Sequence, residues 1–100
     1  MTDRAVRIRG EALDVLRDVL SWELSPARWQ RLAEILQAAD SAQAAGDLDA
    51  LAEATVQLEL TGPVRITRIG SIPQLPPPPP VRERVNHLIH RLSGGTGAGG

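Results

Sequence analysis

Residues 25–62 read SPARWQRLAEILQAADSAQAAGDLDALAEATVQLELTG. Ser25 followed by Pro26 predicts the start of a helix, because serine accepts a bond from a free amide at the N-cap and proline fits the first helical turn. Gly46 predicts the C-terminal cap of that helix, and Asp47 predicts the N-cap of the next one. Because almost no residues separate the two helices, we expect them to pair antiparallel.

Both helices carry an apolar stripe at the spacing of one helical face. In the first helix, the residues predicted to face inward are Trp29, Leu32, Ala33, Leu36 and Ala39, with Ile35 at the edge. In the second helix, which Thr61-Gly62-Pro63 should stop, they are Leu48, Leu51, Ala52, Val56 and Leu58. The stripes predict a core made almost entirely of aliphatic side chains.

The segment before residue 25 predicts a third helix packed on this pair. Its stripe consists of Ala12, Leu13, Val15, Leu16, Val19, Leu20 and Trp22. Gly10 lowers helix stability by about 1 kcal/mol, so we expect the helix to begin near residue 10, with residues 3–9 as a frayed extension in which Val6 and Ile8 can still add packing. Six leucines are predicted to share one contact cluster: Leu16, Leu20, Leu32, Leu36, Leu51 and Leu58.

The pattern changes after residue 62. Residues 63–80 predict an extended strap, with Val64, Ile66 and Ile69 packed on the helices, followed by a polyproline spacer at Pro76–Pro80. Residues 81–92 predict a basic amphipathic helix, and residues 93–100 a disordered glycine-rich tail. The expected fold is all-α: an acidic three-helix bundle or helical hairpin over residues 1–62, the strap, the spacer and a fourth C-terminal helix.

Composition and charge narrow the function classes. The chain has 100 residues, no cysteine and a net charge of −1, which indicates one domain and excludes disulfides and thiolate metal sites. Residues 1–60 contain 6 Arg and 11 acidic residues, whereas residues 61–100 contain 5 Arg and 1 acidic residue. This asymmetry favours a basic C-terminal part folded on the acidic helices, and a partner-binding arm is the alternative. With no apolar run near about 18 residues and no signal-like start, we expect a cytoplasmic protein without a membrane segment.

No motif in the chain indicates catalysis. His87 and His90, with Glu83, form an incomplete set of zinc ligands, so we expect no bound metal. We also expect no cofactor and no enzymatic activity. Nucleic-acid binding is not favoured either, because the basic C-terminal part has no aromatic residue for stacking.

A protein partner is the remaining expectation. The C-terminal helix should either dock its apolar stripe on the bundle or present that stripe to a partner. The residues predicted to bind a partner are Arg65, Arg68, Arg82, Val85, Leu88, Ile89 and Leu92. The oligomeric state stays open.

Several short blocks in order point to a family. They are LRDVL (16–20) with Trp22, LSPARW (24–29), GD (46–47), LELTGPVR (58–65) and PVRERVNHLIH (80–90). Through them, residues 10–92 resemble the CATRA-associated small proteins, short proteins of actinobacteria and similar bacteria encoded with CATRA (caspase and TPR-repeat associated) proteins in conflict or immunity systems. The resemblance implies a non-enzymatic accessory subunit whose partner is CATRA or a caspase-like protein encoded nearby.

The same resemblance leaves a second function open. Many bacterial caspase-like enzymes cut after a basic residue in an extended segment, and Arg65 and Arg68 are the basic residues of the predicted strap. Cleavage after Arg68, the better candidate because little bulk follows it, would separate the acidic bundle from the basic helix. In this alternative the chain is a substrate that releases a signal.

Overall fold

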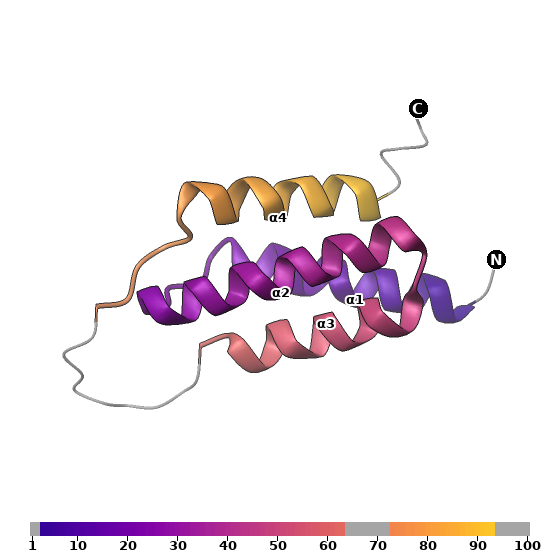
Figure 1. Ribbon diagram of the computed structural model, residues 1–100, viewed down its shortest axis with the longest axis horizontal. Helices are drawn as coiled ribbons and strands as arrows, with labels where there is room; N and C mark the ends of the chain where they lie inside the picture. Colours follow the sequence, from indigo (N-terminus) through magenta and orange to yellow (C-terminus); the bar gives the residue numbers. More distant parts are fainter. Residues whose placement is uncertain (1–2, 64–72, 94–100) are drawn as a thin grey trace.

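The computed structural model describes residues 3–63 and 73–93, and these residues form four helices (Figure 1). The helices are α1 (Asp3–Val19), α2 (Pro26–Ala45), α3 (Leu48–Thr61) and α4 (Pro79–Leu92). Within the described ranges the only extended pairing is one isolated β-bridge. The predicted all-α class is confirmed.

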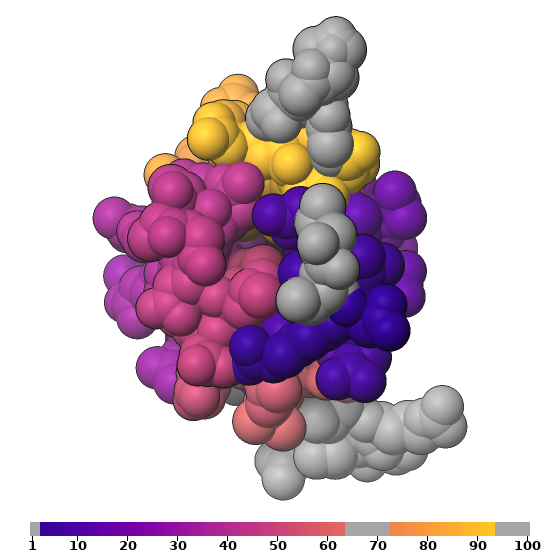
Figure 2. Space-filling view, turned by 90° about the vertical axis from the view of Figure 1, so that its right-hand side faces the viewer, coloured from indigo at the N-terminus to yellow at the C-terminus, as the bar shows by residue number. Residues whose placement is uncertain are grey.

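The four helices form a bundle in which neighbours in sequence are not always neighbours in space. α2 and α3 pair antiparallel, as predicted, and α1 packs against α3 and α4 while α4 also packs against α2. α1 and α2 face each other across one diagonal of the bundle, and α3 and α4 across the other. The end-on view also shows α4 on the side opposite α3 (Figure 2). α3 and α4 therefore each keep an outward face on opposite sides of the molecule.

Local signals fix both ends of α2 and the start of α3. The Ser25 hydroxyl accepts a bond from the Arg28 amide at 3.3 Å, and a carboxylate oxygen of Asp47 accepts one from the Ala50 amide at 3.1 Å. Gly46 has φ of 71°, a left-handed conformation that glycine adopts without steric cost. The predicted caps of both helices are confirmed.

α1 begins earlier than predicted. The expected start near residue 10 is wrong, because α1 runs from Asp3 straight through Gly10. Ile8 is buried in the core, and Arg4 forms an ion pair with Asp49 of α3. Burying one isoleucine stabilises by roughly 1.5–3 kcal/mol, more than the roughly 1 kcal/mol that a helical glycine costs.

The core is a single, mostly aliphatic cluster between the four helices, and α4 contributes buried side chains to it as the other three helices do. Five of the six leucines predicted to meet are buried in it, and Leu20 packs against it partly buried. The buried residues are Ile8, Ala12, Val15, Leu16, Val19, Leu24, Trp29, Leu32, Ile35, Leu36, Ala39, Ala42, Leu51, Ala54, Leu58, Val81, Val85, Leu88 and Leu92. The predicted contact cluster is confirmed.

One predicted core residue of α3 faces outward. Val56 was expected inside but is 51% exposed, whereas Thr55 is buried. Residue 55 lies four positions after Leu51 and three before Leu58, so the helical period puts it on the inner face. Its hydroxyl donates to the Leu51 carbonyl at 2.9 Å, which removes the cost of burying a polar group.

The α1–α2 connection and the described parts of the α3–α4 connection, residues 62–63 and 73–78, lie at the same end of the bundle (Figure 1). There the amides and carbonyls of Leu24 and Leu75 bond reciprocally at 2.9 Å. The buried Trp29 indole N–H also donates to the Leu75 carbonyl at 2.7 Å. Trp29 thus has the predicted core position and also ties the second connection to α2. The predicted packing of Val64, Ile66 and Ile69 lies outside the described residues.

Two side chains hold the end of α3 at this same end of the molecule. One Arg28 guanidinium nitrogen donates to the carbonyls of Thr61 and Gly62 at 3.3 and 2.9 Å, which satisfies acceptors that the helix leaves free. Trp22 is half-buried, and a Cβ built on Gly62 would lie 2.7 Å from its ring. The close approach of the indole to the backbone therefore requires glycine at position 62.

The proline run is divided between spacer and helix. The predicted spacer Pro76–Pro80 is too long, because α4 already begins at Pro79. Pro78 keeps extended angles (φ −63°, ψ 155°) and caps the helix, while the next two prolines occupy its first turn. First-turn amides have no partner within a helix, so proline loses nothing there.

Candidate partner-binding surface

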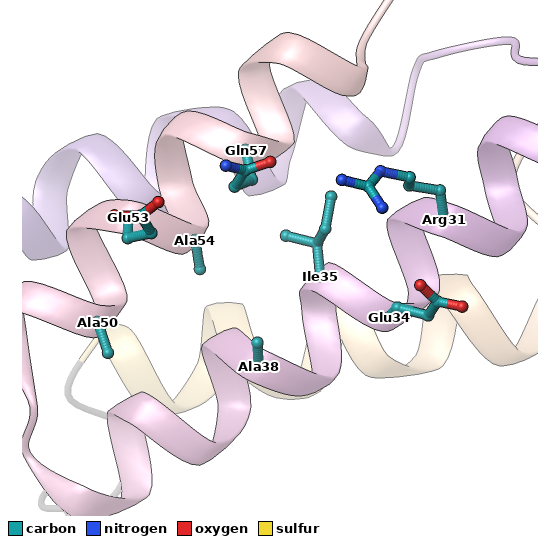
Figure 3. Close-up of a pocket in the computed structure, with 8 residues that line it drawn as sticks. All are labelled: Arg31, Glu34, Ile35, Ala38, Ala50, Glu53, Ala54 and Gln57. Carbon is teal, nitrogen blue, oxygen red and sulfur yellow. The ribbon is translucent and has the colours of Figure 1, made fainter.

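A shallow apolar groove of about 370 Å³ runs between α2 and α3 (Figure 3). Its eight lining residues are Arg31, Glu34, Ile35, Ala38, Ala50, Glu53, Ala54 and Gln57. Ile35 rises from α2 toward Ala54 of α3, and the charged side chains lie along the edges. The groove thus offers an apolar floor with a polar rim.

The groove follows from the size of the side chains that α2 and α3 turn toward each other. Ala38, Ala50 and Ala54 are small, so the two helices meet without filling the space above their contact line. Ala38 and Ala50 are exposed, whereas Ile35 and Ala54 belong to the core. A partner side chain placed in the groove would therefore contact the bundle core directly.

A ridge of apolar side chains lies beside the groove on α3. Val56 is 51% and Leu60 70% exposed, and residues four apart lie on one helical face. Each is also three positions from a groove residue, Glu53 or Gln57, so the ridge and the groove are adjacent. We call the eight groove residues together with Val56 and Leu60 the α2–α3 face. Exposed apolar side chains gathered next to a groove are typical of interaction surfaces.

The helix α3 is acidic. α3 contains Asp49, Glu53 and Glu59 and no basic residue. Asp49 is paired with Arg4, whereas Glu53 and Glu59 form no ion pair with any residue of the described ranges. The outward side of α3 therefore combines apolar contact area with two carboxylates that form no ion pair with a described residue.

The partner-binding residues predicted on the C-terminal helix lie on α4, outside the α2–α3 face. Val85, Leu88 and Leu92 are buried where α4 packs on α1 and α2, and Ile89 is half-buried against the same core. Arg82 is exposed. Of the two alternatives, docking on the bundle is the one that the structure shows, so the apolar stripe of α4 is not free in this state.

Arg65 and Arg68 fall between the two described ranges. The predicted cleavage after Arg68 therefore stays a prediction.

Polar contacts between α4 and α2 accompany the apolar docking. Arg84 lies 3.3 Å and His87 3.9 Å from the Asp40 carboxylate, and Arg91 donates to the Gln43 side chain at 3.2 Å. The basic helix thus meets an acidic residue of α2, in line with the expected charge attraction. The carboxylates of α3 lie across the diagonal and take no part in it.

Over residues 3–63 and 73–93, no three His, Cys, Asp or Glu side chains gather closely enough to hold a metal ion. In the same ranges, no helix combines the length and the apolar character needed to cross a membrane.

Sequence reasoning missed the α2–α3 face. The available signal was the pair Val56 and Leu60, which share the side of α3 opposite Leu51 and Leu58. Assigning Val56 to the core hid this pair. The groove had no signal of its own, because alanines suit both helix interiors and exposed helical positions.

Within residues 3–63 and 73–93, the fold and this face define a small four-helix protein with an apolar surface that the described residues leave uncovered. The chain belongs to the family of CATRA-associated small proteins, whose sequence model matches residues 11–96. This confirms the resemblance found over residues 10–92. Comparisons with curated proteins and with solved structures found no match.

Proposed function

We propose that this chain is a non-enzymatic protein-interaction subunit that binds a CATRA protein through the α2–α3 face. The observation that carries the proposal is the apolar groove flanked by the exposed Val56 and Leu60. The family's name, which associates it with CATRA, supplies the partner. We place the pair in the cytoplasm of a bacterial conflict or immunity system, with a caspase-like protein among its neighbours.

The chemistry of the face supports a binding role. Catalytic pockets usually bring several polar groups together in a concave, water-excluding site. Here the polar side chains Arg31, Glu34, Glu53 and Gln57 stand around an open apolar floor. This arrangement resembles the anatomy of protein interfaces, which have an apolar centre and a polar rim.

The position of α4 supports the same assignment. Its apolar stripe is already used in the core, with Val85 and Leu88 fully buried. A partner that bound this stripe would first have to undock the helix and expose part of the core. The α2–α3 face needs no such rearrangement, so binding there carries the smaller free-energy cost.

Filling the groove should weaken the complex. In Ala38→Trp, the indole occupies the floor of the groove and excludes the partner, and we expect the Kd for purified CATRA protein to rise at least about tenfold, or about 1.4 kcal/mol. Isothermal titration with the full-length chain measures this. Ala44→Trp is the matched control, since Ala44 is also an exposed alanine of α2 but lies nine positions from Ile35, on the side of the helix away from the groove. Equal Kd values for the two variants would contradict binding through this face.

A further inference from the structure

The charge and shape of the α2–α3 face identify the kind of segment that it accepts. We infer that the face receives a basic amphipathic helix of the partner, an inference that rests on the proposed function. The helix would lay its apolar residues over Ile35, Val56 and Leu60 and place arginine or lysine side chains against Glu53 and Glu59.

The backbone of the face argues for a helix over an extended strand. A strand gains affinity by hydrogen bonding to unpaired backbone groups at a sheet edge. The groove lies along the middle of α2 and α3, where backbone amides and carbonyls are bonded within the helices. It offers only side chains, and an amphipathic helix is the element that binds through side chains alone.

The spacing of the apolar contacts suits a helix as well. Ile35 and Ala54 form the floor, and Val56 and Leu60 form a parallel ridge one helical turn long. Apolar side chains at positions i, i+3 or i+4, and i+7 of an incoming helix fall on one stripe that follows such a surface. The small Ala38 and Ala50 allow the backbone of that helix to approach closely.

Charge selects a basic helix. Glu53 and Glu59 flank the ridge, and α3 has no basic residue to neutralise them. Arg31 is the one basic residue of the groove, against Glu34 and Glu53. Complementary charge at the rim of an interface raises the association rate and disfavours acidic competitors.

The molecule already contains a contact of this type. α4 is a basic amphipathic helix that docks Val81, Val85 and Leu88 on the bundle while Arg84 pairs with Asp40 of α2. The inferred partner helix would bind the opposite side of the bundle by the same combination of apolar stripe and flanking arginine. The bundle would then be enclosed by two basic helices, one its own and one from the partner.

Charge reversal on α3 tests the inference. The double variant Glu53→Arg/Glu59→Arg should raise the Kd for purified CATRA protein at least about tenfold, because like charges would face each other. The milder Glu53→Gln/Glu59→Gln should give a smaller rise, and the Kd of the unmodified chain should increase with salt. Glu83→Arg is the control, since Glu83 is an exposed acid on α4. Circular dichroism establishes that each variant is folded.

The outcomes separate the two proposals. A large loss in the α3 variants with less than about a twofold change in Glu83→Arg supports the basic helix. Tight binding by all variants, or a Kd that salt does not change, overturns the inference and leaves the proposed function standing. Absence of binding by the unmodified chain overturns both.

Discussion

Replacing Leu36 by alanine is expected to lower the free energy of unfolding by about 2–5 kcal/mol. Leu36 is completely buried at the centre of the cluster that joins the four helices. The substitution removes apolar area from the core and leaves a cavity that neighbouring side chains fill only in part. Since small domains have a total stability of roughly 5–15 kcal/mol, a large fraction of the protein should then unfold at moderate urea concentrations.

Leu60→Ala is the matched control for Leu36→Ala. It makes the same chemical change on α3 at a side chain that is 70% exposed, so stability should change by less than about 0.5 kcal/mol. Urea unfolding followed by circular dichroism measures both variants. In CATRA binding we expect the reverse order, with Leu60→Ala weakening the complex. A loss of less than about 1 kcal/mol in Leu36→Ala would contradict the position of α2 in the core.

Placing a charge at Leu88 should undock α4. Leu88 is completely buried between α4 and the bundle, and an unpaired carboxylate cannot stay there without a cost of several kcal/mol. In Leu88→Asp the helix should leave the bundle and, at 14 residues, it is too short to persist alone in water. We expect at least about a 3 kcal/mol loss of stability and the loss of amide-exchange protection across residues 81–92.

Asn86→Asp serves as the control for Leu88→Asp. It introduces the same carboxylate two residues away at an exposed position of α4, and exchange should stay as in the unmodified chain. Unchanged protection in Leu88→Asp would mean that α4 does not depend on docking. A second outcome would also contradict the docked helix. If residues 81–92 of the unmodified chain showed no amide-exchange protection alone and gained it when CATRA bound, α4 would fold only with its partner.

The parts of the fold that local sequence signals control were predictable. Ser25, Gly46 and Asp47 act within one turn of their own position, and each has the predicted role. The start of α1 was not predictable in this way. It depends on Ile8 entering a core built by other helices and on Arg4 reaching Asp49, 45 residues along the chain.

The candidate site was harder to predict, for two physical reasons. First, a valine next to a threonine in an apolar helix favours an inward valine, but the period set by Leu51 and Leu58 turns Thr55 inward. Second, a groove depends on how two helices are rotated against each other, and the alanines of α2 and α3 are compatible with many rotations.

The apolar stripe of α4 was recognised from sequence. The sequence did not show whether this stripe docks on its own bundle or on another chain, because both kinds of docking use the same side chains.

Mapping the CATRA contact on the ¹⁵N-labelled chain by NMR tests the central claim most directly, because one titration reports on the backbone amides of all four helices. We predict that unlabelled CATRA protein shifts or broadens the signals of Ile35, Ala38, Ala50, Glu53 and Val56, while the exposed residues of α4, such as Arg82 and Asn86, keep theirs. Perturbation confined to α4, with the signals of the α2–α3 face unchanged, would contradict the account.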